Sequence, residues 1–319
     1  MSPSPPRPDP RRPDPLEVEG VRLNKYLAER GVASRRRCDE LIAGGLVMVD
    51  DEVVTVLGTR IDPSTAKVEV DGVVLRPDAE RRYYLLNKPR GVVCTNEVRE
   101  ARPRAIDLID DPERGRIYTV GRLDEESEGL ILLTSDGEFA QRVAHPRYGV
   151  TKTYLVKLRG RVEGEDIERL RRGVHLAEGR TGGARVRVIK RSNQWTQMQV
   201  TLSEGRNREI RRIFAAVGHK VQGLKRVAIG ELTDRRLKPG QWRPLLRSEV
   251  RELVRATEPG GEVEDAGRRE ARRPASQGHR FGKRAAQHWT ALRTGAERGT
   301  RPPRKSEQGA RKKTPRRKS

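Results

Sequence analysis

The sequence predicts an α+β protein: a small α/β module, followed by a larger domain with a largely antiparallel mixed sheet flanked by helices. Three observations support this class. Several central segments alternate apolar and polar residues with the period of a half-buried strand, others carry apolar residues at helical spacing, and proline-rich or strongly basic sequence is confined to the two ends. The 319 residues leave room for two domains of ordinary size.

The composition indicates that both ends lie outside these domains. Only 34% of the residues are hydrophobic, 35% are charged, and the formal net charge is +23. Residues 268–319 contain eighteen Lys and Arg against three acidic residues, so they carry +15 of that charge. We expect a disordered Pro-rich segment over residues 1–19 and a disordered basic tail over residues 256–319, because neither has an apolar periodicity. Counterion release makes nucleic acid the natural partner of such a tail.

Several classes of protein are disfavoured by what the sequence lacks. No apolar run approaches the length of a membrane span, and the N-terminus has no apolar signal core, so we expect a cytoplasmic protein with no membrane partner. Cys38 and Cys94 match neither a disulfide framework nor a metal site. The sequence has no Gly-rich phosphate loop and no serine nucleophile elbow, and we expect neither metal nor cofactor.

The small module is expected to span residues 20–76. "VRLNKYLAERGVASRRRCDELI" contains two short helices, the first stopped by Gly31 and the second capped by Ser34 and ended by Gly44 and Gly45. Their apolar stripes are Leu23, Tyr26 and Leu27, then Cys38, Leu41 and Ile42. Short strands are expected between residues 46 and 74. The stripe of the second helix turns Arg35, Arg36 and Arg37 toward solvent. With Arg22, Lys25 and Arg60 they are expected to form a basic face of the module.

The larger domain is expected to span residues 81–250. "YYLLNKPRGVVCT" indicates a strand, a turn and a second strand, and "RIYTVGRLDEESEGLILLT" indicates another such pair joined by an acidic loop. Ser135, with Glu138 three residues later, predicts a capping box for the next helix. "KTYLVKLRG", "GARVRVIKR" and "TQMQVTLSEG" alternate as strands, and "NREIRRIFAAVGH" places Ile210, Ile213, Phe214 and Val217 on one helical stripe.

The candidate chemistry lies in three of these segments. The acidic loop holds four carboxylates between two glycines: Asp124, Glu125, Glu126 and Glu128. A guanidinium fixed against a carboxylate can keep it ionised in a partly dry site, and Arg211 lies beside the apolar stripe of its helix, where it could do so. On the residues alone, a solvated acidic loop and a solvent-facing basic helix remain alternatives.

The motifs resemble known RNA-modifying enzymes. "RLNKYLAERGVASRRRCDELI" is similar to the S4-type RNA-binding domain. "GRLDEESEGLILLTSDGEFA", "KTYLVKLRG" and "SEGRNREIRRIFAAVGH", in this order behind that module, resemble the RsuA/RluB-type pseudouridine synthases. The match covers about residues 21–246, and "EGRNREIRR" is more similar to the large-subunit branch of that family than to the small-subunit branch.

The resemblance implies roles for individual residues. It implies that Asp124 is the catalytic aspartate, that Tyr154 packs on the target base, and that Arg211 pairs with the aspartate. Implied pocket residues are Arg122, which helps to hold the flipped-out nucleotide, Leu123, Ile210, and Lys88 and Pro89 of "NKPRG". We expect Arg206 and Arg208 to bind RNA together with the basic residues of the module.

The implied function is conversion of one uridine of 23S ribosomal RNA, or of a large-subunit assembly intermediate, to pseudouridine by a monomeric enzyme. Asp124 could attack C1′ of the sugar or C6 of the base, and the isomerisation requires no cofactor. Two other functions remain open: a non-catalytic S4-domain factor for ribosome assembly, and a hydrolase that uses Asp124 with Glu126.

Overall fold

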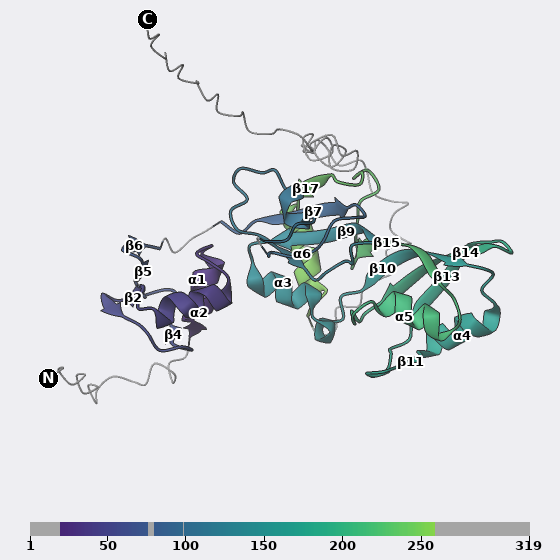
Figure 1. Cartoon of the computed structure of the whole chain (residues 1–319), viewed down its shortest axis with the longest axis horizontal. Coiled ribbons are helices and arrows are strands. Elements are labelled where there is room, and N and C mark those ends of the chain that lie inside the picture. The colour runs from purple at the N-terminus through teal and green to yellow at the C-terminus, as the bar shows by residue number, and fades with distance from the viewer. Residues whose placement is uncertain (1–19, 76–79, 98, 259–319) are drawn as a thin grey trace, which may run out of the picture.

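The computed structural model describes residues 20–75, 80–97 and 99–258. The segment 1–19 and nearly all of the expected tail therefore lie outside the described residues. The described part is an α+β structure with a small N-terminal module and a larger sheet domain, as the sequence predicts (Figure 1). Within it, no helix combines the length and the apolar character that crossing a bilayer requires.

The module packs two helices against short strands, and its predicted apolar stripes are confirmed. Leu23, Tyr26 and Leu27 of the first helix are buried, as are Cys38 and Ile42 of the second, whereas Leu41 is half-buried. Ser34 Oγ accepts a hydrogen bond from Arg37 N at 3.1 Å, which is the predicted N-cap. The elements are β1 (Val21–Arg22), α1 (Leu23–Glu29), α2 (Arg35–Ala43), β2 (Val47–Val49), β3 (Glu52–Val53), β4 (Arg60–Ile61), β5 (Val68–Val70) and β6 (Val73–Val74).

The larger domain is organised by one nine-stranded sheet of order β13-β14-β10-β15-β9-β7-β17, with β16 paired to β15 and β8 to β9. Every pair is antiparallel except β15 with β9. The strands are β7 (Tyr83–Lys88), β8 (Tyr118–Val120), β9 (Glu128–Thr134), β10 (Lys152–Arg159), β13 (Arg185–Arg191), β14 (Trp195–Leu202), β15 (Val221–Ile229), β16 (Leu232–Thr233) and β17 (Trp242–Pro244). A separate hairpin pairs β11 (His175–Leu176) with β12 (Gly179–Arg180).

The single parallel junction brings the acidic loop to the middle of the sheet. Gly129, one residue into β9, has φ +114° and pairs with Arg226 of β15. A Cβ atom there would lie 2.2 Å from the carbonyl oxygen of Arg226, so only glycine permits this approach. The loop that precedes β9 therefore stands beside β15 and its other neighbour, β10.

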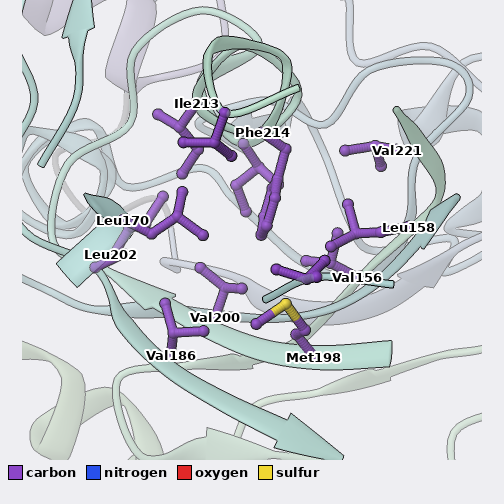
Figure 2. Packing of buried hydrophobic residues seen from close by; sticks show 14 of the residues in the cluster. Val156, Leu158, Leu170, Val186, Met198, Val200, Leu202, Ile213, Phe214 and Val221 are labelled. Carbon is purple, nitrogen blue, oxygen red and sulfur yellow. The ribbon is translucent and has the colours of Figure 1, made fainter. Parts of the chain in front are cut away.

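Helices cover the two halves of the sheet separately (Figure 1). α3 (Gly137–Ala144) and α6 (Arg247–Arg255) share a core with β7, β8 and β9. α4 (Gly164–Arg172) and α5 (Glu209–Ala216) pack on β10, β13 and β14, where Phe214 is fully buried. Figure 2 shows Ile213 and Phe214 of α5 over Val156, Met198 and Val200 of the strands. Two short 3-10 helices span Ala105–Leu108 and Pro146–Tyr148.

The start of α3 differs from the prediction by one residue. Asp136, not Ser135, is the N-cap, because Asp136 Oδ1 accepts hydrogen bonds from Glu138 N and Phe139 N. The predicted capping box is therefore wrong. Ser135 Oγ instead accepts a hydrogen bond from Arg82 N at 3.0 Å. This bond links the start of α3 to the residue that precedes β7.

The second strand predicted after the Lys-Pro-Arg-Gly turn is also wrong. Val93 makes only an isolated bridge with Arg104, because its backbone bonds to Pro103 and Ala105 rather than to β7. Its apolar neighbours are buried by the loop that follows. No pattern in the sequence predicted α4, α6 or β15, although β15 is the strand that joins the two halves of the sheet.

Candidate functional site

A cavity of about 130 Å³ lies between the acidic loop and the start of α5, over β10 and β15. Its walls come from segments that are far apart in the sequence, so only the fold assembles it. The predicted site residues that line it are Arg122, Leu123, Asp124, Tyr154, Arg206, Arg208 and Ile210. The lining does not include the predicted residues Arg211, Lys88 and Pro89.

Asp124 lies between two guanidinium groups. Its Oδ2 atom is 3.3 Å from Arg208 Nη1 and 3.6 Å from Arg211 Nε. The Arg211 side chain is only 15% exposed, and its Nη2 atom also lies 3.5 Å from Glu126 Oε2. The pairing of Asp124 with Arg211 is thus present in the structure. Because the Arg211 side chain is largely shielded from water, its attraction to the Asp124 carboxylate is screened less than that of an exposed arginine would be.

Backbone contacts hold the loop that carries Asp124. Ser127 N donates to Asp124 O at 3.0 Å, which closes a turn, and Gly91 N donates to Glu125 O at 2.9 Å. Leu123 is buried, and its N–H donates to Cys94 Sγ at 3.4 Å. The loop is therefore fastened from behind to the segment that follows β7.

Lys88 explains the role of the "NKPRG" motif in this arrangement. Its side chain is completely buried, and Nζ donates to Pro89 O at 2.8 Å and to Val92 O at 2.7 Å. Burial lowers the pKa of Lys88 to about 8. Lys88 and Pro89 therefore shape the turn under the acidic loop and do not line the cavity.

Tyr154 and Ile210 form the apolar part of the site. Tyr154 is half-buried on β10 and packs against the hydrophobic clusters of both sheet halves. Ile210 lies in the first turn of α5 and is 4% exposed. Both side chains line the cavity that also contains Asp124. An aromatic ring beside a carboxylate can hold a flat base next to a nucleophile.

The two arginines before α5 differ in their surroundings. Arg206 Nε bonds to Glu204 Oε2, and its Nη atoms donate to the carbonyls of Gly179 and Arg180. Arg208 has φ +48° and an exposed side chain that reaches Asp124. Arg208 is thus better placed for contact with RNA than Arg206, whose guanidinium already binds the protein; the RNA-binding roles of both stay predictions.

The basic residues of the module lie on its surface. Arg35, Arg36 and Arg37 are exposed, and Arg37 pairs with Glu40 of the same helix. Arg22 is exposed as well, and the Arg60 side chain donates to Gly20 O. Lys25 lies 3.7 Å from Glu29. No contact here identifies a ligand, so RNA binding by this face stays a prediction.

Four charged residues that line the cavity were not predicted from the sequence: Lys152, Glu204, Glu209 and Arg226. Lys152 is 8% exposed, and its Nζ atom donates to Val143 O at 3.1 Å; burial, with a smaller contribution from Arg226, lowers the pKa of Lys152 to about 8. Arg226 is also buried, with 4% exposure. Glu209 is buried at the start of α5, and this burial raises the pKa of its carboxyl group. Strand alternation was a usable signal for Lys152, because it lies two residues before Tyr154 and so shares its face.

The described residues contain no group of three His, Cys, Asp or Glu side chains that could hold a metal ion. What the site offers is a carboxylate held by a guanidinium, an aromatic ring, and buried cations on the strands beneath. This set suits nucleophilic attack on an electrophilic carbon of a flat, polar ligand.

Comparisons with known proteins agree with this chemistry. The family model described as RNA pseudouridylate synthase matches residues 82–216, and the S4 domain model matches residues 21–66. The ribosomal large subunit pseudouridine synthase B of Bacillus subtilis is 42% identical over 234 residues, which cover 73% of this chain and 95% of that protein. The ribosomal small subunit pseudouridine synthase A of Escherichia coli K12 is 36% identical over 237 residues, 73% of this chain and 100% of that protein.

A solved structure shares the fold. A crystal structure described as a pseudouridylate synthase superimposes with a TM-score of 0.54 at 33% sequence identity. The match covers 74% of this chain and 100% of the other. The likeness therefore spans both the S4-like module and the sheet domain rather than one motif.

Proposed function

Because the chain belongs to the RNA pseudouridylate synthase family and carries an S4 domain, we propose that it isomerises one uridine of 23S ribosomal RNA with Asp124 as the nucleophile. The observation that carries this proposal is the placement of Asp124 against Arg211 in a cavity that Tyr154 also lines. The choice of large-subunit RNA is supported by the higher identity to the large-subunit enzyme, 42% against 36%.

The reaction replaces the N1–C1′ bond between base and sugar by a C5–C1′ bond. Asp124 Oδ attacks C1′, and the electron pair of the N1–C1′ bond passes to the base; alternatively it attacks C6, and the pair of the C5=C6 bond passes toward O4. In both routes the N1–C1′ bond breaks with its electron pair staying on the base, C5 bonds to C1′, and the carboxylate is released. C5 loses a proton and N1 gains one. No atom enters or leaves overall, so the net reaction needs no second substrate.

The other site residues hold the nucleotide during these steps. The target uridine must leave its stack, which costs a few kcal/mol. Stacking on Tyr154 returns about 1–3 kcal/mol, and Arg122, exposed at the cavity wall, is placed to hold the flipped nucleotide. We assign RNA binding to the S4-like domain of residues 20–76 and catalysis to residues 81–250, in a protein that acts as a monomer on 23S RNA or an assembly intermediate.

Two variants test the nucleophile. Asp124→Asn and Glu126→Gln each remove one carboxylate that pairs with Arg211. Asp124 Oδ2 lies 3.6 Å from Arg211 Nε, and Glu126 Oε2 lies 3.5 Å from Arg211 Nη2, so each variant loses one ion pair of similar length. We expect Asp124→Asn to abolish pseudouridine formation while RNA binding survives, and Glu126→Gln to retain most activity. Pseudouridine in ribosomal RNA is mapped by carbodiimide-dependent stops of reverse transcription.

The same experiment separates the two other candidate functions. A hydrolase that uses both carboxylates would be severely impaired by either substitution, and it would release free uracil and leave an abasic site. If the protein were a non-catalytic assembly factor, even the wild-type protein would convert no uridine. Full activity of Asp124→Asn would show that Asp124 is not the nucleophile.

A further inference from the structure

A buried guanidinium beneath the cavity is not accounted for by the roles given above. Arg226 is 4% exposed and lines the cavity together with Asp124. Its Nε atom donates to Leu130 O at 2.6 Å, whereas its Nη2 atom is buried and, among the described residues, has no hydrogen-bond partner. An unpaired buried donor on a charged group is costly, so its presence in the cavity wall points to a ligand.

The strands fix where this guanidinium lies. Arg226 is the cross-strand partner of Tyr154 in the β10–β15 pair, and directly opposite residues share a face of the sheet. The close approach at Gly129 and the hydrogen bond to Leu130 hold Arg226 against β9, the strand that follows the Asp124 loop. The donor is therefore fixed beside the strand position of Tyr154, in the wall of the cavity that Asp124 also lines.

A second buried cation lies beside it. Lys152 lines the same cavity from β10, and its Nζ atom donates to Val143 O. The electrostatic effect of Arg226 contributes to the lowered pKa of Lys152, so the two cations are close enough to repel each other. This repulsion would be relieved by a ligand that carries negative charge, and hardly at all by a neutral one.

The base becomes such a ligand during the reaction. After attack at C1′, the departing uracil carries the electron pair of the N1–C1′ bond, and its charge is shared with O2 and O4. After attack at C6, the pair of the C5=C6 bond becomes an enolate on O4. In both routes negative charge develops on a carbonyl oxygen of the base.

We propose that Arg226, supported by Lys152, donates a hydrogen bond to a carbonyl oxygen of the flipped uracil and stabilises the negative charge that forms on the base. This inference rests on the proposed function. Because the cations are fixed before the substrate arrives and bind the charged base better than uridine, they lower the barrier instead of only tightening binding.

The test uses the full-length protein and an RNA containing the uridine that the wild type converts. Arg226→Met removes the charge and the donors, and Arg226→Lys keeps the charge. Lys225→Met is the matched control, because Lys225 is the preceding residue of β15 and does not line the cavity of Asp124; it lines only the neighbouring groove, which Arg226 also borders. We expect a fall of about 10²–10³-fold in the single-turnover rate at saturating RNA for Arg226→Met, a smaller fall for Arg226→Lys, and little change for Lys225→Met or in RNA affinity.

A substrate change separates this role from a structural one. Sulfur accepts hydrogen bonds weakly, so RNA with 4-thiouridine or 2-thiouridine at the target should react more slowly with the wild type at the oxygen that Arg226 contacts. That thio effect should shrink toward onefold in Arg226→Met, which has no donor left, and by less in Arg226→Lys, which keeps a charged donor. A thio effect that is unchanged in both variants, or an unchanged rate in Arg226→Met, would overturn the inference. A wild type that forms no pseudouridine would instead refute the proposed function.

Discussion

Lys152 and Lys88 are two charges that the folded protein holds at a cost. Burial lowers the pKa of each from 10.5 to about 8. The unfolded chain therefore binds these protons more tightly than the folded one between pH 8 and 10.5. Below pH 8 each lysine lowers the free energy of unfolding by about 3 kcal/mol, and this loss is relieved as the pH rises through that window.

A pH series on one variant tests this linkage. For each lysine, the free energy of unfolding of the wild type should gain about 2 kcal/mol between pH 7.5 and 9.5. Lys152→Met should lose its own share of that gain. Urea unfolding at both pH values measures the difference, and work above pH 10 is avoided because the pKa of Tyr83, raised to about 12, introduces the opposite slope. An identical pH dependence in the variant would contradict the prediction.

At the scale of residues, the sequence predicts those functional side chains that stand out in a local sequence pattern. Asp124 stands out among acids between glycines, and Arg211 can be placed beside the apolar stripe of its helix. Arg226 could not be found in this way, because a cation inside an apolar strand contradicts the preference of charges for water. Its burial depends on Gly129 and Leu130 of a strand nearly one hundred residues earlier.

Among the elements, the parallel β9–β15 pair is the junction on which the site depends. Gly129→Ala would place a Cβ atom 2.2 Å from Arg226 O, at a φ of +114°. Gly160→Ala is a matched control, because Gly160 also has a positive φ of 78° but no atom within 4 Å of the position that a Cβ would take. Comparing the two separates the close approach of two strands from the strain of a left-handed backbone.

The expected effects differ strongly. Gly160→Ala should cost about 1–2 kcal/mol of unfolding free energy, the ordinary penalty for a left-handed residue. Gly129→Ala should cost about 4 kcal/mol or more, because strand separation adds to that penalty, and pseudouridine formation should fall with it. Denaturant midpoints give both values. Equal costs for the two variants would show that the junction has room to relax.

The elements themselves were predictable where their periodicity was local. The helices of the module, the stripe of α5 and the strands β10, β13 and β14 each follow from spacing alone. The cap of α3 did not, because Ser135 and Asp136 are both good caps and the choice depends on Arg82, which takes the serine hydroxyl. The order of strands in the sheet rests on contacts between distant segments and has no signature within any one of them.

For the whole molecule, the order of an RNA-binding module before a sheet domain could be predicted from the motifs, and the matches to residues 21–66 and 82–216 agree with it. The charge was predictable as well, since +15 of the +23 belongs to residues 268–319. That tail lies outside the described residues, and we propose that it raises affinity for RNA without choosing the uridine, because phosphate contacts carry no base information.

The two domains should divide RNA positioning and chemistry between them. If the exposed Arg35, Arg36 and Arg37 contact phosphates, changing all three to alanine should weaken RNA binding and lower the slope of log K against log salt by up to about 3. The single-turnover rate at saturating RNA should hardly change, because the cavity lies in the other domain. The matched control changes Arg247, Arg251 and Arg255, three exposed arginines of α6.

Both triple variants lose the same formal charge from one helix. A salt titration of RNA binding and a rate at saturation therefore distinguish a specific contact from a loss of net charge. If the α6 variant lowered the salt slope as much as the module variant, the module would contribute only its charge. If the saturated rate of the module variant collapsed, Arg35, Arg36 and Arg37 would act in the chemical step, and the separation of RNA positioning from catalysis would be wrong.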